Sequence, residues 1–543
     1  MKTGPAVSKT TTVFLLGCLL LLSGCAVGPD FKKPEAQVAE EWVSSADPHV
    51  IKRKEADYSN WWTVFDDPIL DTLIDTAYRQ NLPLQVAGVR ILEARANLGI
   101  AIGEQFPQAQ QAVGSLVYTG LSSNAPNVGL ADKNFWDFNL GFDAAWELDF
   151  WGRFRRGVES ASASMGASIT NYDDILVSLT AEVARTYVVI RTLEELIAVT
   201  RHNIEIQQRS FEIADVQFRN GAVSELDPQQ ALSLLRDTQS LLPPLQASLS
   251  QAKYALSILL GMPPSNLQAI LGDNPGQIPL APDEVAIGIP ADLLRRRPDV
   301  HFAELQAAAQ SARIGVVKAD LFTRITLVGS LGFQSSESNG FLSNSTHLSQ
   351  IFSSKSFTYF IGPDVQWNIL NYGRIKNNVR VQDARLEELI VNYQNTVLKA
   401  AKEVEDGLAG FLGAQKQVVF LDDGVEAAER AVHLAGIQYR EGAVDYTRVL
   451  NTEQSLIQQQ TTWIQARGGI ATNLIAIYKA LGGGWELRKG KEFVPVHLQK
   501  EMSERTDWGE FFDKPQAELP EDLPEPPPTG TEQPLINKPM SVW

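Results

Sequence analysis

The sequence predicts a mainly α-helical protein with a small β part, built from one structural unit that occurs twice. Three observations lead to this fold class: a repeat of fixed spacing, two very long proline-free segments of helical periodicity, and two pairs of short segments in which apolar and polar residues alternate. A fixed period of self-similarity indicates duplication, and the two kinds of periodicity distinguish helix from strand. The expected unit is a duplicated helix-hairpin-helix repeat.

The repeat has a spacing of about 221 residues and needs no gap. The clearest matches are Trp151-Gly152-Arg153 with Tyr372-Gly373-Arg374, Phe218-Arg219-Asn220-Gly221 with Tyr439-Arg440-Glu441-Gly442, and Leu260-Gly261 with Leu481-Gly482. Chance similarity rarely keeps one register over about 110 residues, so we interpret the two halves as copies of one unit.

Each copy contains one segment of helical periodicity without proline, residues 154–218 and 375–439. At 1.5 Å per residue such a segment forms a rod of about 100 Å, whereas helices of ordinary globular domains average about 11–12 residues. Each rod ends before a glycine, Gly221 or Gly442, which is the residue expected for a left-handed helix cap. The chain is then expected to turn back into return helices at 225–261 and 445–482.

The β part is predicted from alternation of apolar and polar residues at 112–120 and 135–150, and again at 325–333 and 357–369. An antiparallel strand that covers a soluble core would show the same pattern, and the pattern of a membrane strand is weak in any one segment. The four segments are each about ten residues long, which matches a tilted membrane strand.

Four strands cannot close a barrel, and an open sheet edge in lipid leaves backbone groups unpaired at several kcal/mol each. Membrane barrels begin at about eight strands. The chain is therefore expected to associate, and a homotrimer would supply twelve strands. The rods would continue such a barrel as a helical tube, so the assembly is predicted to be a conduit through lipid.

The N-terminus has the order of a secretory signal peptide: Lys2 and Lys9, an apolar run, and the small residues before Cys25. The run is too short for a membrane-spanning helix. It resembles a bacterial lipoprotein signal, in which Cys25 becomes the N-terminus and carries an S-diacylglycerol and an N-palmitoyl group. Ala26 after the cysteine favours the outer membrane. The alternative is an ordinary signal peptide that contains a cysteine.

No catalytic constellation is recognisable in the sequence. Its two cysteines are Cys18, within the signal, and Cys25, and the six histidines have no ligand spacing, so no metal site and no cofactor are expected. A phosphate-binding loop and a nucleophile elbow are also missing from the sequence. The formal charge of −17 argues against nucleic acid as a partner. An enzyme is the least favoured class.

Several motifs resemble the outer-membrane factor (TolC-like) family, in its NodT/OprM-type lipoprotein branch, over residues 25–487. These motifs are Cys25-Ala-Val-Gly-Pro-Asp-Phe, Trp61-Trp62, the Trp151-Gly-Arg and Tyr372-Gly-Arg turns, Ile289-Pro290 to Val300, Tyr439-Arg440, and Leu481-Gly-Gly-Gly-Trp485. The resemblance implies a homotrimer with a twelve-stranded outer-membrane β-barrel, a twelve-helix periplasmic α-barrel and an equatorial belt.

By the same resemblance the protein is expected to be the exit duct of a tripartite efflux pump, passively conducting small molecules such as drugs. A periplasmic adaptor would join it to an inner-membrane transporter of the resistance-nodulation-division (RND) type. A type I protein-secretion duct would have the same fold. A periplasm-spanning structural lipoprotein without a pore is the alternative from a different class.

The predicted organisation comprises a signal peptide (1–24), an acylated N-terminal segment (25–68), the first repeat (69–261), an equatorial linker (262–291), the second repeat (292–482), and a C-terminal segment with an acidic, proline-rich tail (483–543). The purpose of the tail cannot be derived from its composition. In the second repeat Thr323 stands where Pro107 ends the corresponding helix of the first.

The resemblance also nominates residues at the two hairpin tips. In similar proteins a Tyr-Arg pair at the second tip ties the closed aperture together, which maps onto Tyr439 and Arg440. The alternative is that this pair only holds the turn. The positions that usually line the constriction are Thr447 and Asn451, which depart from the family pattern, so Asp445 and Arg448 are expected to contribute to gating. Adaptor docking is expected at the tip residues Arg219, Gly221, Arg440 and Gly442.

Overall fold

The computed structural model describes residues 26–52, 58–124, 133–272, 276–287, 296–337 and 348–512. The predicted signal peptide, the acylation site Cys25, the acidic tail from residue 513 and part of the motif before Pro298 lie outside these residues. In chain order the helices, 3₁₀ helices (η) and strands are η1 (Val43–Ala46), β1 (Val50–Lys52), η2 (Trp61–Phe65), α2 (Pro68–Gln80), α3 (Leu82–Gly103), β2 (Ala109–Gly120), β3 (Asn134–Glu147), α4 (Arg153–Arg219), α5 (Leu226–Leu259), α6 (Gln268–Leu271), β4 (Val285–Ile287), α8 (Pro298–Lys318), η3 (Ala319–Leu321), β5 (Arg324–Glu337), η4 (Leu348–Gln350), β6 (Phe357–Gln366), α9 (Arg374–Arg440), α10 (Tyr446–Ala480), η5 (Trp485–Arg488), α11 (Val496–Arg505) and η6 (Gly509–Phe511).

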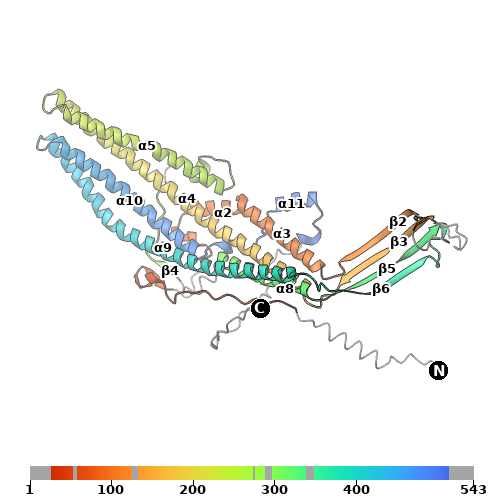
Figure 1. Ribbon diagram of the computed structural model, residues 1–543. Helices are drawn as coiled ribbons and strands as arrows, with labels where there is room; N and C mark the ends of the chain where they lie inside the picture. Colours follow the sequence, from red (N-terminus) through yellow and green to blue (C-terminus); the bar gives the residue numbers. More distant parts are fainter. Residues whose placement is uncertain are drawn as a thin grey trace, which may run out of the picture.

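The molecule is an elongated bundle with a sheet at one end and two helical hairpins at the other (Figure 1). The rods α4 and α9 contain 67 residues each, which corresponds to about 100 Å. Helix α4 packs against α5 and α10, and α10 packs against α9. Within the described part of the chain, no helix is both long enough and apolar enough to cross a membrane.

The sheet is antiparallel, with strand order β2-β3-β5-β6, so the strands of the two copies lie side by side. One face carries most of the apolar residues of the four strands, including most of the large side chains of β3. On this face Phe142, Tyr359 and Ile361 are 63%, 71% and 75% exposed in the single chain. This exposure excludes the alternative of a strand pair that covers a soluble core. The opposite face carries Asp137 and Asp143.

Four strand boundaries differ from the sequence pattern by three or four residues: the start of β2 and the ends of β3, β5 and β6. The reason is that pairing, rather than alternation, sets the ends of strands. Strand β2 begins at Ala109, since Gln110 and Gln111 pair with β3 although both are polar. Strand β6 ends at Gln366 instead of residue 369. Its partner β5 begins at Arg324, directly opposite Gln366, so the strand pairing stops there.

The main hydrophobic core lies midway along the bundle, where the two copies meet. Here the Trp61 ring stacks on Tyr478 with ring centroids 5.4 Å apart, and Trp62 meets Trp61 edge-on. The glycines of the Leu481-Gly-Gly-Gly-Trp485 motif pack against this cluster. A Cβ atom at Gly483 would lie 2.9 Å from a backbone oxygen of residue 58, and one at Gly484 would lie 3.2 Å from the Trp61 ring. Two family motifs that are distant in sequence therefore form one contact.

Candidate aperture at the hairpin tips

The two hairpins end in the same backbone motif. Gly221 and Gly442 have φ of 74° and 71°, the left-handed region that glycine tolerates at a helix terminus. In each tip a backbone N–H bonds back across the last turn, from Ala222 to the Gln217 carbonyl at 2.9 Å and from Ala443 to the Gln438 carbonyl at 2.8 Å. A Cβ on either glycine would meet open space, so conformation and not crowding requires glycine here.

A small core joins the two tips within one chain. Its buried members come from all four helices of the hairpins: Ala214, Ala231, Ala435, Tyr439, Tyr446 and Val449. Three of these six residues are alanines, whose small side chains allow helices to approach closely. The only buried rings, Tyr439 and Tyr446, meet edge to face with centroids 5.3 Å apart.

Tyr439 is 4% exposed, and its hydroxyl donates a hydrogen bond of 3.1 Å to Oδ2 of Asp227 at the start of α5. Burial, and then the neighbouring Asp227 carboxylate, raise the pKa of the Tyr439 phenol well above its ordinary value. The end of the second rod is thus bonded to the return helix of the first hairpin. Sequence reasoning selected Tyr439 but missed Asp227.

The repeat contains a signal that could have identified Asp227. A shift of 221 positions aligns Tyr439 with Phe218, and Arg448 with Asp227. The hydroxyl and the carboxylate therefore occur together in the pair Tyr439 and Asp227. The equivalent pair, in which the two copies exchange places, consists of the phenyl ring of Phe218 and the guanidinium of Arg448. In the structure this diverged pair, Tyr439 with Asp227, forms a contact between the two copies.

The other nominated residues do not join the hairpins to each other in the single chain. Arg440 is exposed and donates from Nε to the carbonyl of Gly436, one turn earlier in its own helix, at 3.2 Å. Asp445 caps α10 by accepting from the backbone N–H of Arg448 at 3.3 Å. Thr447, the Arg448 side chain and Asn451 are exposed on the first turns of α10. At the first tip, Arg219 pairs with Asp215 at 2.8 Å.

Glu453 is a second residue that sequence reasoning missed. It lies on α10, two turns from the tip, with 3% exposure, and the Ser210 hydroxyl of α4 donates to its Oε1. Its Oε2 is buried and finds no hydrogen-bond donor among the described residues. Burial raises the pKa of the Glu453 carboxyl to about 7, and the Ser210 hydrogen bond lowers it only in part. A proton-sensitive group therefore sits between the two hairpins.

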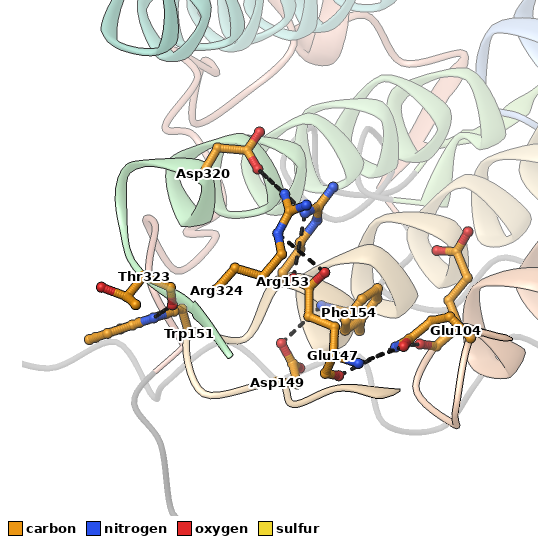
Figure 2. Close-up of polar contacts among 10 residues, drawn as sticks. Glu104, Glu147, Asp149, Trp151, Arg153, Phe154, Asp320, Thr323 and Arg324 are labelled. Atoms are coloured by element: carbon orange, nitrogen blue, oxygen red, sulfur yellow. Dashed lines mark hydrogen bonds and ion pairs between the residues drawn. The ribbon is translucent and has the colours of Figure 1, made fainter. Parts of the chain in front are cut away.

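At the opposite end of the rods, a four-membered charge network holds the sheet to the helices (Figure 2). Arg153 reaches Glu147 at 3.6 Å and Asp320 at 3.4 Å. Arg324 reaches the same two carboxylates at 3.3 and 3.4 Å. Each acid lies between two guanidiniums. Asp149 completes the junction by accepting from the backbone N–H of residues 154 and 155, which caps α4.

Two indole groups hold the bend of the second copy, where Thr323 replaces the proline of the first. The Trp151 indole N–H donates to the Thr323 carbonyl at 2.8 Å, and the Trp367 indole N–H donates to the Leu321 carbonyl at 3.2 Å. The helix ends in a 3₁₀ turn, Ala319–Leu321, before the strand begins. Hydrogen bonds from the two indoles therefore hold the helix-to-strand bend that a proline at position 323 would otherwise impose.

The model of the family described as outer membrane efflux protein matches residues 73–262 and 289–483. The chain belongs to this family. Pyoverdine export outer membrane protein OpmQ of Pseudomonas putida is 29% identical over 472 residues, covering 86% of this chain and 97% of that protein. The probable outer membrane lipoprotein SilC of Salmonella typhimurium is 26% identical over 471 residues, covering 87% and 98%. The solved structure of the outer-membrane channel OprN superposes with a TM-score of 0.78 at 31% identity, covering 85% of this chain and all of that one.

These similarities confirm the predicted family, the mainly helical fold with a small sheet from which trimeric channels of this kind are built, and the outer membrane as its location. The chain is accordingly an outer-membrane efflux channel. The matched relatives are channels and not enzymes. Within the described residues, no group of three or more histidine, cysteine, aspartate or glutamate side chains could hold a metal ion.

Proposed function

We propose that three copies of this chain form the exit duct of a tripartite efflux pump, which passively conducts small molecules from a periplasmic adaptor and an inner-membrane RND-type transporter to the exterior. One observation carries the proposal: strands β2 and β6 each have a single neighbour, while the sheet has one apolar, exposed face. A sheet that faces lipid needs partners at both edges. Neighbouring copies would supply them, β6 of one chain pairing with β2 of the next.

The lipid anchor at Cys25 is supported by where the chain after it lies. The backbone N–H of Val27 donates to the Trp151 carbonyl at 2.9 Å, and Ala26 packs directly against Gly152. Both contacts are at the junction of sheet and rods. Acyl chains on Cys25 would thus start at the membrane-proximal end of the tube, where they can insert by burying their CH₂ groups.

The hairpin tips would form the periplasmic aperture and the docking surface of the adaptor. In this proposal the hydrogen bond from Tyr439 to Asp227 holds the two hairpins of one chain together. Arg440, whose side chain is exposed in the single chain, would bind a neighbouring chain of the trimer. The exposed Thr447, Arg448 and Asn451 would line the constriction. The tip glycines Gly221 and Gly442, with Arg219 and Arg440, would contact the adaptor.

The decisive experiment is reconstitution of the purified, full-length acylated protein in planar lipid bilayers, with its mass in detergent measured in parallel. We expect a trimer and discrete conductance steps. A monomer, or a trimer without conductance, would contradict the duct and favour a structural lipoprotein. Deletion of the gene should then sensitise cells to several small drugs or dyes. Loss of secretion of one large protein, with unchanged drug sensitivity, would favour a type I secretion duct instead.

A further inference from the structure

A polar recess of about 580 Å³ lies where α4, α8 and α9 meet, between the central core and the sheet. Its walls carry serine hydroxyls from α4, glutamine amides from α8 and α9, and the guanidinium groups of Arg313 and Arg385. This volume falls in the range of sites for small organic molecules, about 300–1,000 Å³. Helix α8 packs against both α4 and α9.

The two arginines supply the unused hydrogen-bond donors of the recess. Neither Arg313 nor Arg385 forms an ion pair or a side-chain hydrogen bond with another described residue, and both are exposed. By contrast, the hydroxyls of Ser160, Ser164 and Ser168 already donate to backbone carbonyls at 2.8 to 3.1 Å. The amide of the intervening glutamine, residue 310, donates to residue 382. The recess therefore offers two guanidinium groups without a partner among the described residues, and several side-chain oxygen atoms that can still accept hydrogen bonds.

The side of the tube on which the recess opens follows from helix α8. Phe302, Gln306 and Arg313 face the recess, and at 100° per residue Glu304 and Gly315 fall on the opposite face. That opposite face is covered by the N-terminal segment: Lys33 pairs with Glu304 at 2.5 Å, and a Cβ on Gly28 would lie 2.5 Å from the Gly315 Cα.

The N-terminal segment leads to the acylation site, so it has to run outside the tube, where lipid is accessible. The recess, on the other face of α8, then belongs to the inner wall. This step rests on the proposed function. Three-fold symmetry would place six guanidiniums on the wall at one level of the lumen.

We infer that this recess is a transit site for small organic anions, with Arg313 and Arg385 binding a carboxylate group. Guanidinium forks match carboxylates in geometry and stay charged at every relevant pH. Rings of basic side chains select anions in pores, and conduction requires binding that is strong enough to admit a solute and weak enough to release it. A site that is exposed to the lumen and has no buried charge fulfils the second requirement.

The test uses the full-length trimer in planar bilayers, with phthalate, an aromatic dicarboxylate, as the probe. We expect phthalate to cause brief, concentration-dependent block of the wild type. Arg313→Gln with Arg385→Gln should weaken this block about tenfold and shift the reversal potential in a KCl gradient towards cations. The Lys pair, Arg313→Lys with Arg385→Lys, should keep most of the anion preference. Arg505→Gln, on the exposed surface of the C-terminal helix α11, removes one charge away from the recess and is the control.

Both glutamines replace exposed, unpaired side chains, so assembly should be unaffected, and the mass in detergent checks this. Equal block and equal selectivity in the wild type and the glutamine pair would overturn the inference, as would the same loss in the Arg505 variant. These results differ from failure of the duct itself, in which the wild type would show no conductance at all. Block of the lysine pair as weak as that of the glutamine pair would reject binding through positive charge at this site.

Discussion

The hydroxyl of Tyr439, at the last turn of α9, donates to the carboxylate of Asp227, at the first turn of α5, across 212 positions of sequence. One hydrogen bond thereby joins the two hairpins of one chain at the narrow end of the proposed duct. Both duplicated equivalents, Phe218 and Arg448, lack the chemistry to repeat it. The two-fold symmetry of the repeat is broken at the place where gating is proposed.

Tyr439→Phe should raise single-channel conductance. It removes a hydrogen bond to a charged group, worth about 1.5–3 kcal/mol, and leaves the aromatic contact with Tyr446 in place. Adding Arg440→Ser should raise conductance further if Arg440 holds a neighbouring chain. Tyr254→Phe, at an exposed tyrosine on α5, is the matched control and should change nothing. Unchanged conductance in the double variant would reject the latch and leave a pair that only holds the turn.

The packing of α10 on α4 should weaken as pH rises. The ordinary pKa of glutamate is 4.5, and that of Glu453 in the packed hairpins is about 7. Between pH 4.5 and about 7, Glu453 is protonated when the helices are packed and ionised when they are separated. The contribution of this proton to the stability of the packed state is therefore complete below about pH 4.5 and is lost by about pH 7. Its size is on the order of 3 kcal/mol.

Thermal unfolding of the trimer at pH 5, 6, 7 and 8 measures this effect. The wild type should melt at progressively lower temperature, whereas Glu453→Gln, which cannot ionise, should show a much flatter profile. Glu426→Gln, at an exposed glutamate of α9, should follow the wild type. Parallel profiles for the wild type and the Glu453 variant would show that this carboxyl does not control the contact.

Local patterns predicted the rods and the hairpins because their causes are local. An uninterrupted helical period and a glycine at its end set α4 and α9, and alternation set the strands. The ends of β2 and β6 depend on which partner residues are opposite, for example Gln366 on Arg324, and alternation does not contain that information.

Of the residues that join the hairpins, sequence reasoning identified only Tyr439, although the divergence of the two repeats also marks Asp227 as a candidate. Tyr439 was nominated by resemblance, but Asp227 and Glu453 acquire their roles from contacts across 212 and 243 positions. An isolated glutamate in a helix usually indicates a solvated face. The packing of α10 against its neighbouring helices buries Glu453, so its raised pKa could not be anticipated from the sequence.

Gly442→Ala should destabilise the second tip. At φ of 71° an alanine incurs roughly 1–2 kcal/mol of strain, although no atom obstructs its methyl group. Gly436→Ala, one turn and a half earlier in the straight part of α9, should instead stabilise the helix by up to about 1 kcal/mol, since it reduces the freedom of the unfolded chain. Denaturant midpoints of the two variants should therefore move in opposite directions. An unchanged or higher midpoint for Gly442→Ala would indicate that the tip does not depend on the left-handed residue.

Glu147→Gln should loosen the joint between sheet and rods. Glu147 pairs with both Arg153 and Arg324, so the substitution leaves two guanidiniums to share Asp320. At this partly buried position we expect a loss of about 1–2 kcal/mol, several times the value of an isolated surface pair. Glu182→Gln removes the carboxylate of an exposed pair within one helix and should cost less than about 0.5 kcal/mol. In a double-mutant cycle with Arg324→Gln, a coupling free energy near zero would mean that these two charges are close only because the backbone brings them together.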